Sequence, residues 1–148
     1  MYQIIPLLLA FAMLMPWTGP ADPGNRMAAA NAADGLAEQA LIYHQAAVAY
    51  VFAHPTTSGA VPVALPAGWT TAGVSACVKA QVVATYVTVP STVSRPAVAA
   101  AMARLWGGYS LAGLSLTSTL SNPMSGTALS LPCTIADQTP VLVSQAGG

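Results

Sequence analysis

The sequence predicts an α+β domain that follows an apolar N-terminal segment, with a long amphipathic helix and a second short helix packed on one face of a small, mainly antiparallel sheet. Three observations predict this class. Apolar residues recur at helical spacing between residues 27 and 54. An alanine-rich stretch between residues 92 and 108 repeats that spacing. Later segments alternate Val or Leu with Ser or Thr, which is typical of strands.

The N-terminal segment, residues 1–18, is predicted to be a signal or anchor, because an apolar run extends from Ile4 to Trp17. A helix of that length covers roughly 21 Å, which is short for a hydrocarbon core about 30 Å thick. A membrane anchor and a cleaved signal peptide therefore both stay open. Residues 19–26, rich in Gly and Pro, are predicted to be a linker, and residues 27–148 a single exported domain.

The long helix is expected over residues 27–54, because Pro55 keeps the residue before it out of the helical region. One stripe along it is the candidate packing or partner surface: Leu36, Ala40, Tyr43, Ala47 and Tyr50. Such a stripe is more often core than a binding seam. His44 and His54 are interpreted as a polar-edge residue and a C-terminal residue of the helix.

Residues 56–73 are expected to form a connector with one short strand over residues 60–65, and Trp69 is expected to fold back on the helix. One long strand is predicted from Val74 to Val89, because its side chains alternate between two faces. Both predictions depend on short-range pattern alone.

The second helix is predicted over residues 92–108, with Ser94 as its cap and Gly107 and Gly108 as its stop. Its core-facing residues are expected to be Val98, Met102 and Leu105. The remaining strands are expected within residues 109–120, 126–132 and 139–144, with a turn over residues 122–126.

Formal charge is scarce and balanced, with four basic and four acidic residues in 148. No basic stripe is available to neutralise a row of phosphates, so we expect no binding to nucleic acid. A surface with so little charge resists association poorly at neutral net charge. The composition therefore favours a subunit of an assembly, and a homo-oligomer is one form that such an assembly can take.

Cys77 and Cys133 are the two cysteines of the chain, and neither belongs to a CxxC pair. His44 and His54 are spaced so that they lie on nearly opposite faces of a helix, so we expect no metal site. A disulfide between the cysteines is the favoured interpretation in an exported domain, and a reactive thiol is the weaker alternative.

Catalytic motifs are missing from the sequence: it contains no nucleophile elbow, phosphate-binding loop, zinc-protease motif or dinucleotide fingerprint. The acidic residues are scattered, which disfavours a carboxylate pair for acid and base chemistry. We therefore expect no catalytic residues, no cofactor and no enzymatic activity. The less favoured alternative is a hydrolase triad that combines a serine with His44 or His54 and Asp137.

Short residue groups add a family resemblance to this interpretation. They are Tyr43-His44-Gln45, Ala49-Tyr50, the Pro-Ala-Gly-Trp segment at residues 66–69 and the closing Thr-Pro-Val-Leu-Val segment at residues 139–143. With the apolar N-terminus and the order of elements, they resemble the small PilM proteins of type IVB thin-pilus systems in conjugative plasmids and their chromosomal relatives.

This resemblance implies a non-enzymatic accessory or structural component of pilus biogenesis. The expected location is the inner membrane facing the periplasm, or the periplasm after signal cleavage. The implied partners are other pilus-assembly proteins or pilins, together with the membrane through the N-terminal segment. The resemblance implies no catalytic residues.

Two alternatives remain beside it. A minor pilin or pseudopilin also places a long helix before a small sheet with a disulfide, but its continuous apolar helix carries an early Glu, which residues 4–17 lack. A secreted binding module is the other alternative, and it would be soluble and monomeric with an occupied pocket.

Overall fold

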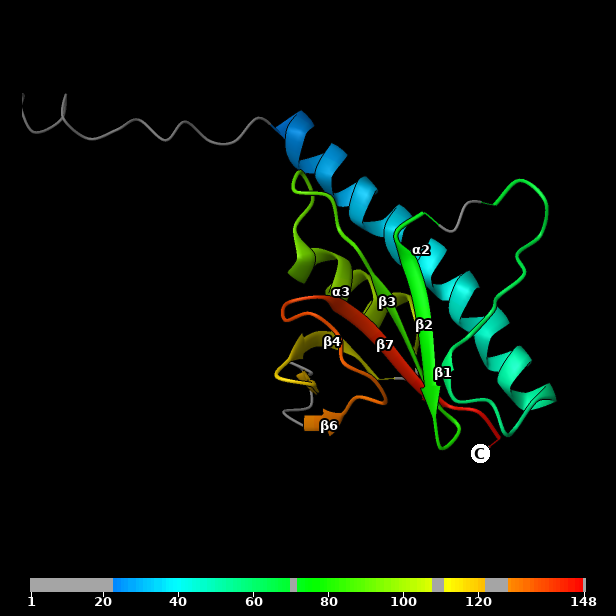
Figure 1. Cartoon of the computed structure of the whole chain (residues 1–148). Coiled ribbons are helices and arrows are strands. Elements are labelled where there is room, and N and C mark those ends of the chain that lie inside the picture. The colour runs from blue at the N-terminus through cyan, green and yellow to red at the C-terminus, as the bar shows by residue number, and fades with distance from the viewer. Residues whose placement is uncertain (1–22, 70–71, 108–110, 122–127, 148) are drawn as a thin grey trace, which may run out of the picture.

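The computed structural model describes residues 23–69, 72–107, 111–121 and 128–147 (Figure 1). The elements in chain order are α2 (Pro23–Ala53), β1 (Gly59–Ala60), β2 (Val74–Lys79), β3 (Val82–Val87), α3 (Arg95–Leu105), β4 (Leu111–Leu116), β5 (Thr119–Ser121), β6 (Ala128–Ser130) and β7 (Pro140–Gln145). The strands form one sheet in the order β1-β2-β3-β7-β4-β5-β6, and every described pairing is antiparallel. The predicted α+β class is confirmed.

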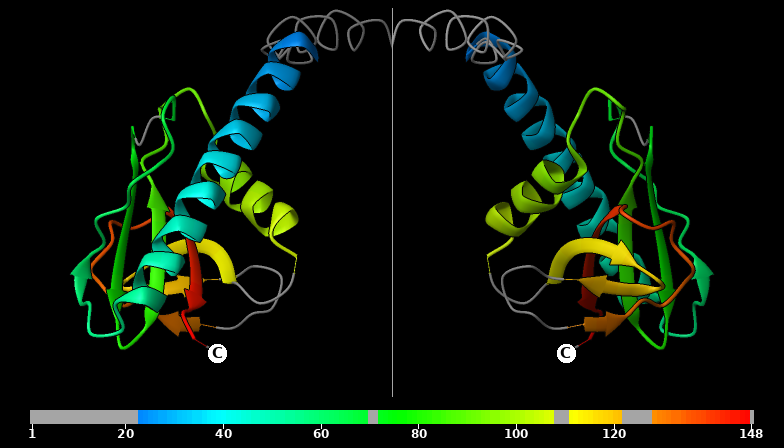
Figure 2. Two further views of the ribbon diagram at one scale, coloured as in Figure 1. Left: turned by 90° about the vertical axis from the view of Figure 1, so that its right-hand side faces the viewer. Right: turned by 90° about the vertical axis from the view of Figure 1, so that its left-hand side faces the viewer.

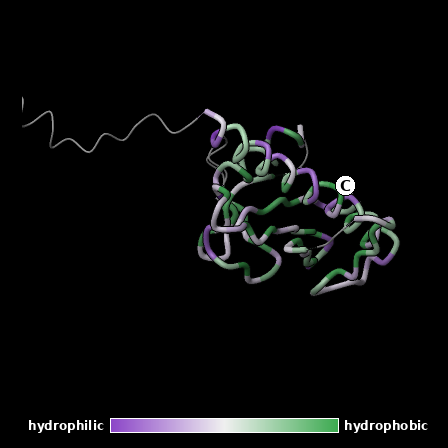
Figure 3. The backbone as a smooth tube through the Cα atoms, turned by 90° about the horizontal axis from the view of Figure 1, so that it is seen from above, coloured by the Kyte–Doolittle hydropathy of each residue, from purple (hydrophilic) through white to green (hydrophobic). Residues whose placement is uncertain are grey.

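The last strand in sequence, β7, lies in the middle of the sheet between β3 and β4. Both helices cover the same face: α2 packs on β2, β3 and β7, and α3 packs on β4 and β7 (Figure 2). The strands carry long hydrophobic stretches in Figure 3, whereas the alanine-rich helices are paler. Valines of the strands and alanines of the helices therefore build the main core together.

Helix α2 begins at Pro23, four residues before the expected start, so the second half of the predicted linker is helical. Proline is suited to the first helical position, because its fixed φ is already helical and its missing N–H would have no intrahelical partner. Residues 23–32 are all exposed. They form an extension of α2 that projects past the sheet (Figure 1).

The opposite face of the sheet has a smaller core of its own. Its members are Cys77, Ala84, Leu120, Ile135, Val141 and Val143, with half-buried neighbours that include Leu129 and Leu131. These residues come from β2, β3, β5 and β7 and from the segment between β6 and β7. Strands β5 and β6 and that segment therefore pack against the outer face of β3 and β7, so both faces of these two strands are buried.

The single long strand predicted over residues 74–89 is wrong, because the chain reverses direction between β2 and β3. Ala80 and Gln81 form this turn with φ values of 49° and 63°. A two-residue hairpin turn with positive φ at both positions is usually marked by Asn or Gly. Neither Asn nor Gly is present at these two positions, so the sequence contains no residue that marks the turn, and the alternating pattern runs through it.

Two expected core contacts are also wrong. Trp69 is 48% exposed, and its place against the core is taken by Val61, Val63 and Leu65 of the same connector. Leu105 is 40% exposed because α3 ends there, whereas Val98 and Met102 are fully buried as expected. The expected strand over residues 60–65 is reduced to β1, which pairs with β2 through two residues.

Several predictions fall wholly or partly outside the described residues. The signal or anchor segment of residues 1–18 does so, as does the whole turn over residues 122–126. Within the described residues, no helix combines the length and apolarity needed for a membrane span.

Gly113 in β4 offers a direct test of the close packing between β4 and β5. A Cβ atom at this position would collide with the backbone carbonyl of Ser121. We expect Gly113→Ala to lower the free energy of unfolding by about 2 kcal/mol, measured by urea denaturation. Gly35→Ala is the matched control, because a Cβ atom there meets nothing and α2 gains helix propensity. Equal stability of the two variants would contradict the close approach.

Candidate functional site

A buried polar cluster joins both helices to the two central strands. His44 of α2 is fully buried. Its Nδ1 lies 2.9 Å from Thr85 Oγ1 on β3, and its Nε2 lies 2.7 Å from Ser144 Oγ on β7. The indole ring of Trp106, at the end of α3, meets the imidazole edge to face at a centroid distance of 5.3 Å. The expectation that His44 lies at the polar edge of the helix is wrong.

His44 is neutral at physiological pH in this environment. Burial lowers its pKa to about 4, because the charged imidazolium would lose its hydration. A neutral imidazole has one donor and one acceptor nitrogen, and each hydroxyl group can serve either role. One hydroxyl therefore donates to the ring while the other accepts from it. Both ring nitrogens of this deeply buried histidine are satisfied, as stability requires.

The pair of His44 and Ser144 has the atoms of a base and a nucleophile but lacks the usual support for catalysis. The second ring nitrogen contacts the hydroxyl of Thr85 where hydrolase triads have a carboxylate to stabilise the imidazolium. Asp137, the carboxylate considered for a triad, instead accepts a hydrogen bond from the Thr117 backbone N–H. A histidine whose pKa is about 4 is also a weak base toward a serine hydroxyl at neutral pH.

His54 lies apart from this cluster, at the C-terminal end of α2. Its Nδ1–H donates to the backbone carbonyl of Tyr50 at 2.9 Å, and its ring stacks on the Tyr50 ring at a centroid distance of 4.4 Å. This position agrees with the sequence interpretation. Within the described part of the chain, no three His, Cys, Asp or Glu side chains gather in a way that could hold a metal ion.

The candidate stripe of α2 lies against the sheet and α3. Ala40, Tyr43 and Ala47 are buried in the main core, and Leu36 and Tyr50 are half-buried against it. Burial also raises the pKa of Tyr43. An exposed ion pair between Asp34 and Arg104 joins α2 to α3 beside the stripe. In this arrangement the stripe supplies packing inside the domain.

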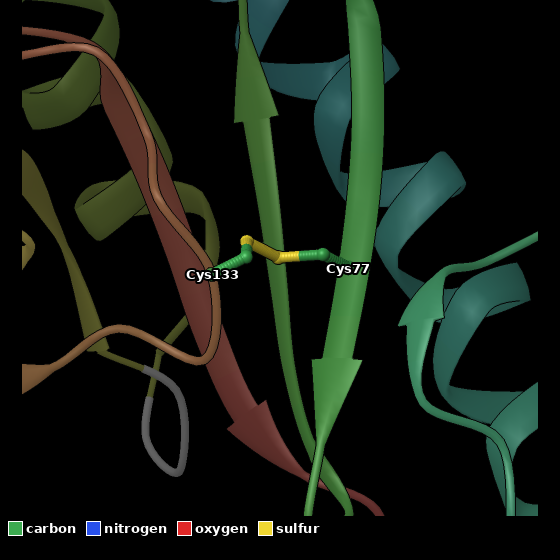
Figure 4. Close-up of a disulfide and its surroundings, with 2 residues drawn as sticks. All are labelled: Cys77 and Cys133. Carbon is green, nitrogen blue, oxygen red and sulfur yellow. A yellow bond between two sulfur atoms is a disulfide. The ribbon is translucent and has the colours of Figure 1, made fainter.

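Cys77 and Cys133 form a disulfide on the face of the sheet opposite the helices (Figure 4). Cys77 belongs to β2, and Cys133 belongs to the segment between β6 and β7. This segment crosses the outer face of the sheet and buries Ile135 beneath it. The disulfide thus holds the outer segment to β2 across the two central strands.

Ser115 of β4 anchors the same segment, a role that the sequence pattern did not reveal. Its hydroxyl donates to the Ala136 carbonyl and accepts from the Thr139 N–H. Its backbone N–H donates to the Thr139 carbonyl, and its carbonyl accepts from the Gln138 N–H. A buried serine among alternating Leu and Ser residues resembles a surface position in sequence, and only the fold distinguishes it.

A comparison with protein families shows which family the chain belongs to. The family model described as PilM matches residues 8–143. The chain belongs to the PilM family. No curated protein and no solved structure matches the chain. Membership of PilM associates the chain with pilus biogenesis and with pilus-assembly partners in general.

The buried histidine predicts a loss of stability in acid. The unfolded state binds a proton near the ordinary histidine pKa of 6.5, whereas folded His44 does so only near 4. The contribution of neutral His44 to the free energy of unfolding is therefore complete above pH 6.5. It is lost as the pH falls toward 4, and the total loss is about 3 kcal/mol. Urea denaturation of the wild type at pH 7.5 and pH 4 measures the loss.

A matched variant isolates the contribution of His44 to this loss of stability. His44→Gln should show a smaller loss between the two pH values, and His54→Gln should lose as much as the wild type. The same loss in all three proteins would contradict a buried neutral His44.

The disulfide predicts equal effects of its two cysteines. It closes a loop with a sequence separation of 56. In the chain-entropy model such a loop contributes about 4 kcal/mol to the free energy of unfolding. We expect Cys77→Ser and Cys133→Ser to lower that free energy equally, and the double variant to lower it no further. Reductant should destabilise the wild type alone, and unequal single variants would argue against a shared bond.

Proposed function

We propose that this PilM chain is a non-enzymatic accessory component of type IVB pilus biogenesis that acts through protein–protein contacts on the periplasmic side of the inner membrane. The observation that carries the proposal is the family match over residues 8–143. The match places the chain in pilus biogenesis, and the type IVB subtype, the compartment and the manner of action are the proposed additions.

The disulfide and the leader support a periplasmic location. Stable structural disulfides belong to oxidising compartments, of which the bacterial periplasm is one. The bond between Cys77 and Cys133 holds a segment that packs on the outer face of the sheet, and it should stabilise the domain where it can form. The apolar run of residues 4–17 would supply export, either as an anchor or as a cleaved signal.

The surface of the domain supports a role in contacts. Met27 in the α2 extension is 68% exposed and Phe52 at the other end of α2 is 72% exposed. The chain carries four basic and four acidic residues, so little charge repels a partner. The extension also separates the domain from the leader by about 15 Å, the length of ten helical residues. A subunit held in an assembly has these properties.

A non-enzymatic role is supported by the way His44 is used. Its two ring nitrogens engage the hydroxyl groups of Thr85 and Ser144, and Trp106 packs on its ring. These contacts join α2, α3, β3 and β7 into one core. The cluster therefore has a structural explanation that needs no substrate.

One observation favours a second candidate, a minor pilin or pseudopilin-like subunit. The long helix α2 precedes an antiparallel sheet that carries a disulfide, which is the general layout of such subunits. Gly19 and Pro20, which precede α2, argue for the accessory role, because a filament subunit needs a continuous apolar helix.

Deletion of the gene in its natural pilus-bearing host tests the proposal. We expect the deletion to abolish thin pili in electron micrographs and mating in liquid, and the wild-type gene supplied in trans to restore both. Normal piliation of the deletion strain would overturn the proposal.

Sheared pili separate the two candidates. An accessory component should stay with the cell envelope and be absent from purified filaments. Its presence in filaments at a constant ratio to the major subunit would favour the minor pilin instead.

A further inference from the structure

An apolar groove lies on the outer face of the sheet, between β6 and the turn that joins β2 to β3. Its volume is about 460 Å³, within the range of ligand sites in proteins. Its lining includes the branched apolar side chains of Val82, Leu111, Leu129, Leu131 and Val143. All are half-buried except Val143, which is buried, so an occupant would meet apolar walls on several sides.

Within the described part of the chain, the rim of the groove includes an unpaired strand edge. The Leu131 N–H donates to the Ser118 carbonyl, so these residues form a hydrogen-bonded pair of the β5–β6 ladder. Such pairs alternate in antiparallel strands, and Leu120 with Leu129 is therefore the next one. Ser130 lies between them and directs its backbone N–H and carbonyl away from β5. It is exposed, belongs to the last strand of the sheet and lines the groove.

One positive charge lies at the same rim. Lys79 ends β2, is exposed and lines the groove. Within the described ranges its side chain has neither a hydrogen bond nor an ion pair, and no Asp or Glu lines the groove. The groove therefore combines apolar walls, a free backbone edge and an unpaired cation.

We propose that this groove binds an extended apolar segment of a partner protein, which adds as a strand to β6 at Ser130 and directs a carboxylate to Lys79. Backbone hydrogen bonds supply affinity in this mode of recognition, and side-chain pockets supply specificity. The alternate side chains of the segment enter the groove, because successive residues of a strand point to opposite faces.

Charge distinguishes this occupant from the chain itself. Strand β6 consists of Ala128, Leu129 and Ser130, so a second copy paired through β6 would bring no carboxylate on the added strand itself. The N-terminal segment, whose acidic residue is Asp22, joins the described domain at the start of α2, and this end of the helix is the one farthest from the β2–β3 turn (Figure 1). A separate partner with an acidic residue fits the groove better than either.

The assignment of that partner to the pilus machinery rests on the proposed function, whereas its chemistry rests on the groove alone. Binding to the purified protein tests the groove, and the deletion strain tests the function. Either can fail without the other.

Selection of random peptides displayed on phage, with the purified full-length protein as bait, tests the groove. We expect enriched peptides to alternate apolar residues and to contain one Asp or Glu. A fluorescein-labelled copy of the most enriched peptide then gives a Kd by anisotropy. Failure to enrich such peptides would overturn the proposal.

Ser130→Pro removes the outward N–H and costs no bond of the β5–β6 ladder, because proline is tolerated at a strand edge that faces solvent. We expect it to weaken binding about tenfold, and Ser130→Ala, which keeps the N–H, to bind like the wild type. Equal weakening in both variants would contradict strand addition. If analytical ultracentrifugation shows a dimer and Ser130→Pro dissociates it, the occupant of the groove is a second copy of the chain, and the partner segment is overturned.

Lys79→Glu tests the charge without touching the strand edge, since Lys79 has no partner to lose. The Lys79→Glu variant should bind the selected peptide more weakly than the wild type does. It should bind more tightly to a version of the peptide whose acidic residue is replaced by Lys. An unchanged preference between the two peptides would show that Lys79 does not face the segment, and would overturn the carboxylate assignment.

Discussion

Close packing of α2 on the central strands through small side chains is the constraint on which the rest of the structure depends. Ala37, Ala40 and Ala47 are fully buried, and valines of β2 and β3 are buried against them. Alanine loses no side-chain entropy when it is buried and allows a helix to lie close to a sheet. The long helix can therefore cover three strands without bulky side chains of its own.

Because of this close packing, the polar residues on the same face must find their hydrogen-bond partners inside the domain. His44 has no route to solvent once α2 lies on the sheet, so its two ring nitrogens must be satisfied inside. Thr85 and Ser144, from strands adjacent in the sheet but distant in sequence, supply the partners. The cluster thereby fixes how α2 lies across β3 and β7, because a displaced helix would leave buried polar atoms unpaired.

The fold class was predictable because it depends on periodicity. The details of the site could not be predicted, since they depend on long-range contacts. Spacing in α2 revealed its buried face, and alternation revealed most strand positions. The turn at Ala80 and Gln81 was not predicted, because neither residue is typical of positive φ. His44 and Ser115 resembled surface positions in local sequence, and their burial follows from strands and segments far along the chain. The central place of β7 has the same origin, since nothing in its own residues selects its neighbours.

Coverage of the sheet on two sides connects the fold with the proposed function. The helices cover one face, and β5, β6 and the disulfide-linked segment pack against the other, which leaves the groove beside β6 open. A domain of this kind presents surfaces for partners at its groove and along the α2 extension. Its disulfide fastens the outer layer to β2.

The most direct test of the account is intact mass combined with membrane fractionation of the natively expressed protein, with and without reductant. The account predicts an envelope-associated species, anchored or cleaved after the leader, whose mass is lower by two hydrogens before reduction than after it. A reduced, full-length protein in the cytosolic fraction would contradict a periplasmic component of the pilus machinery.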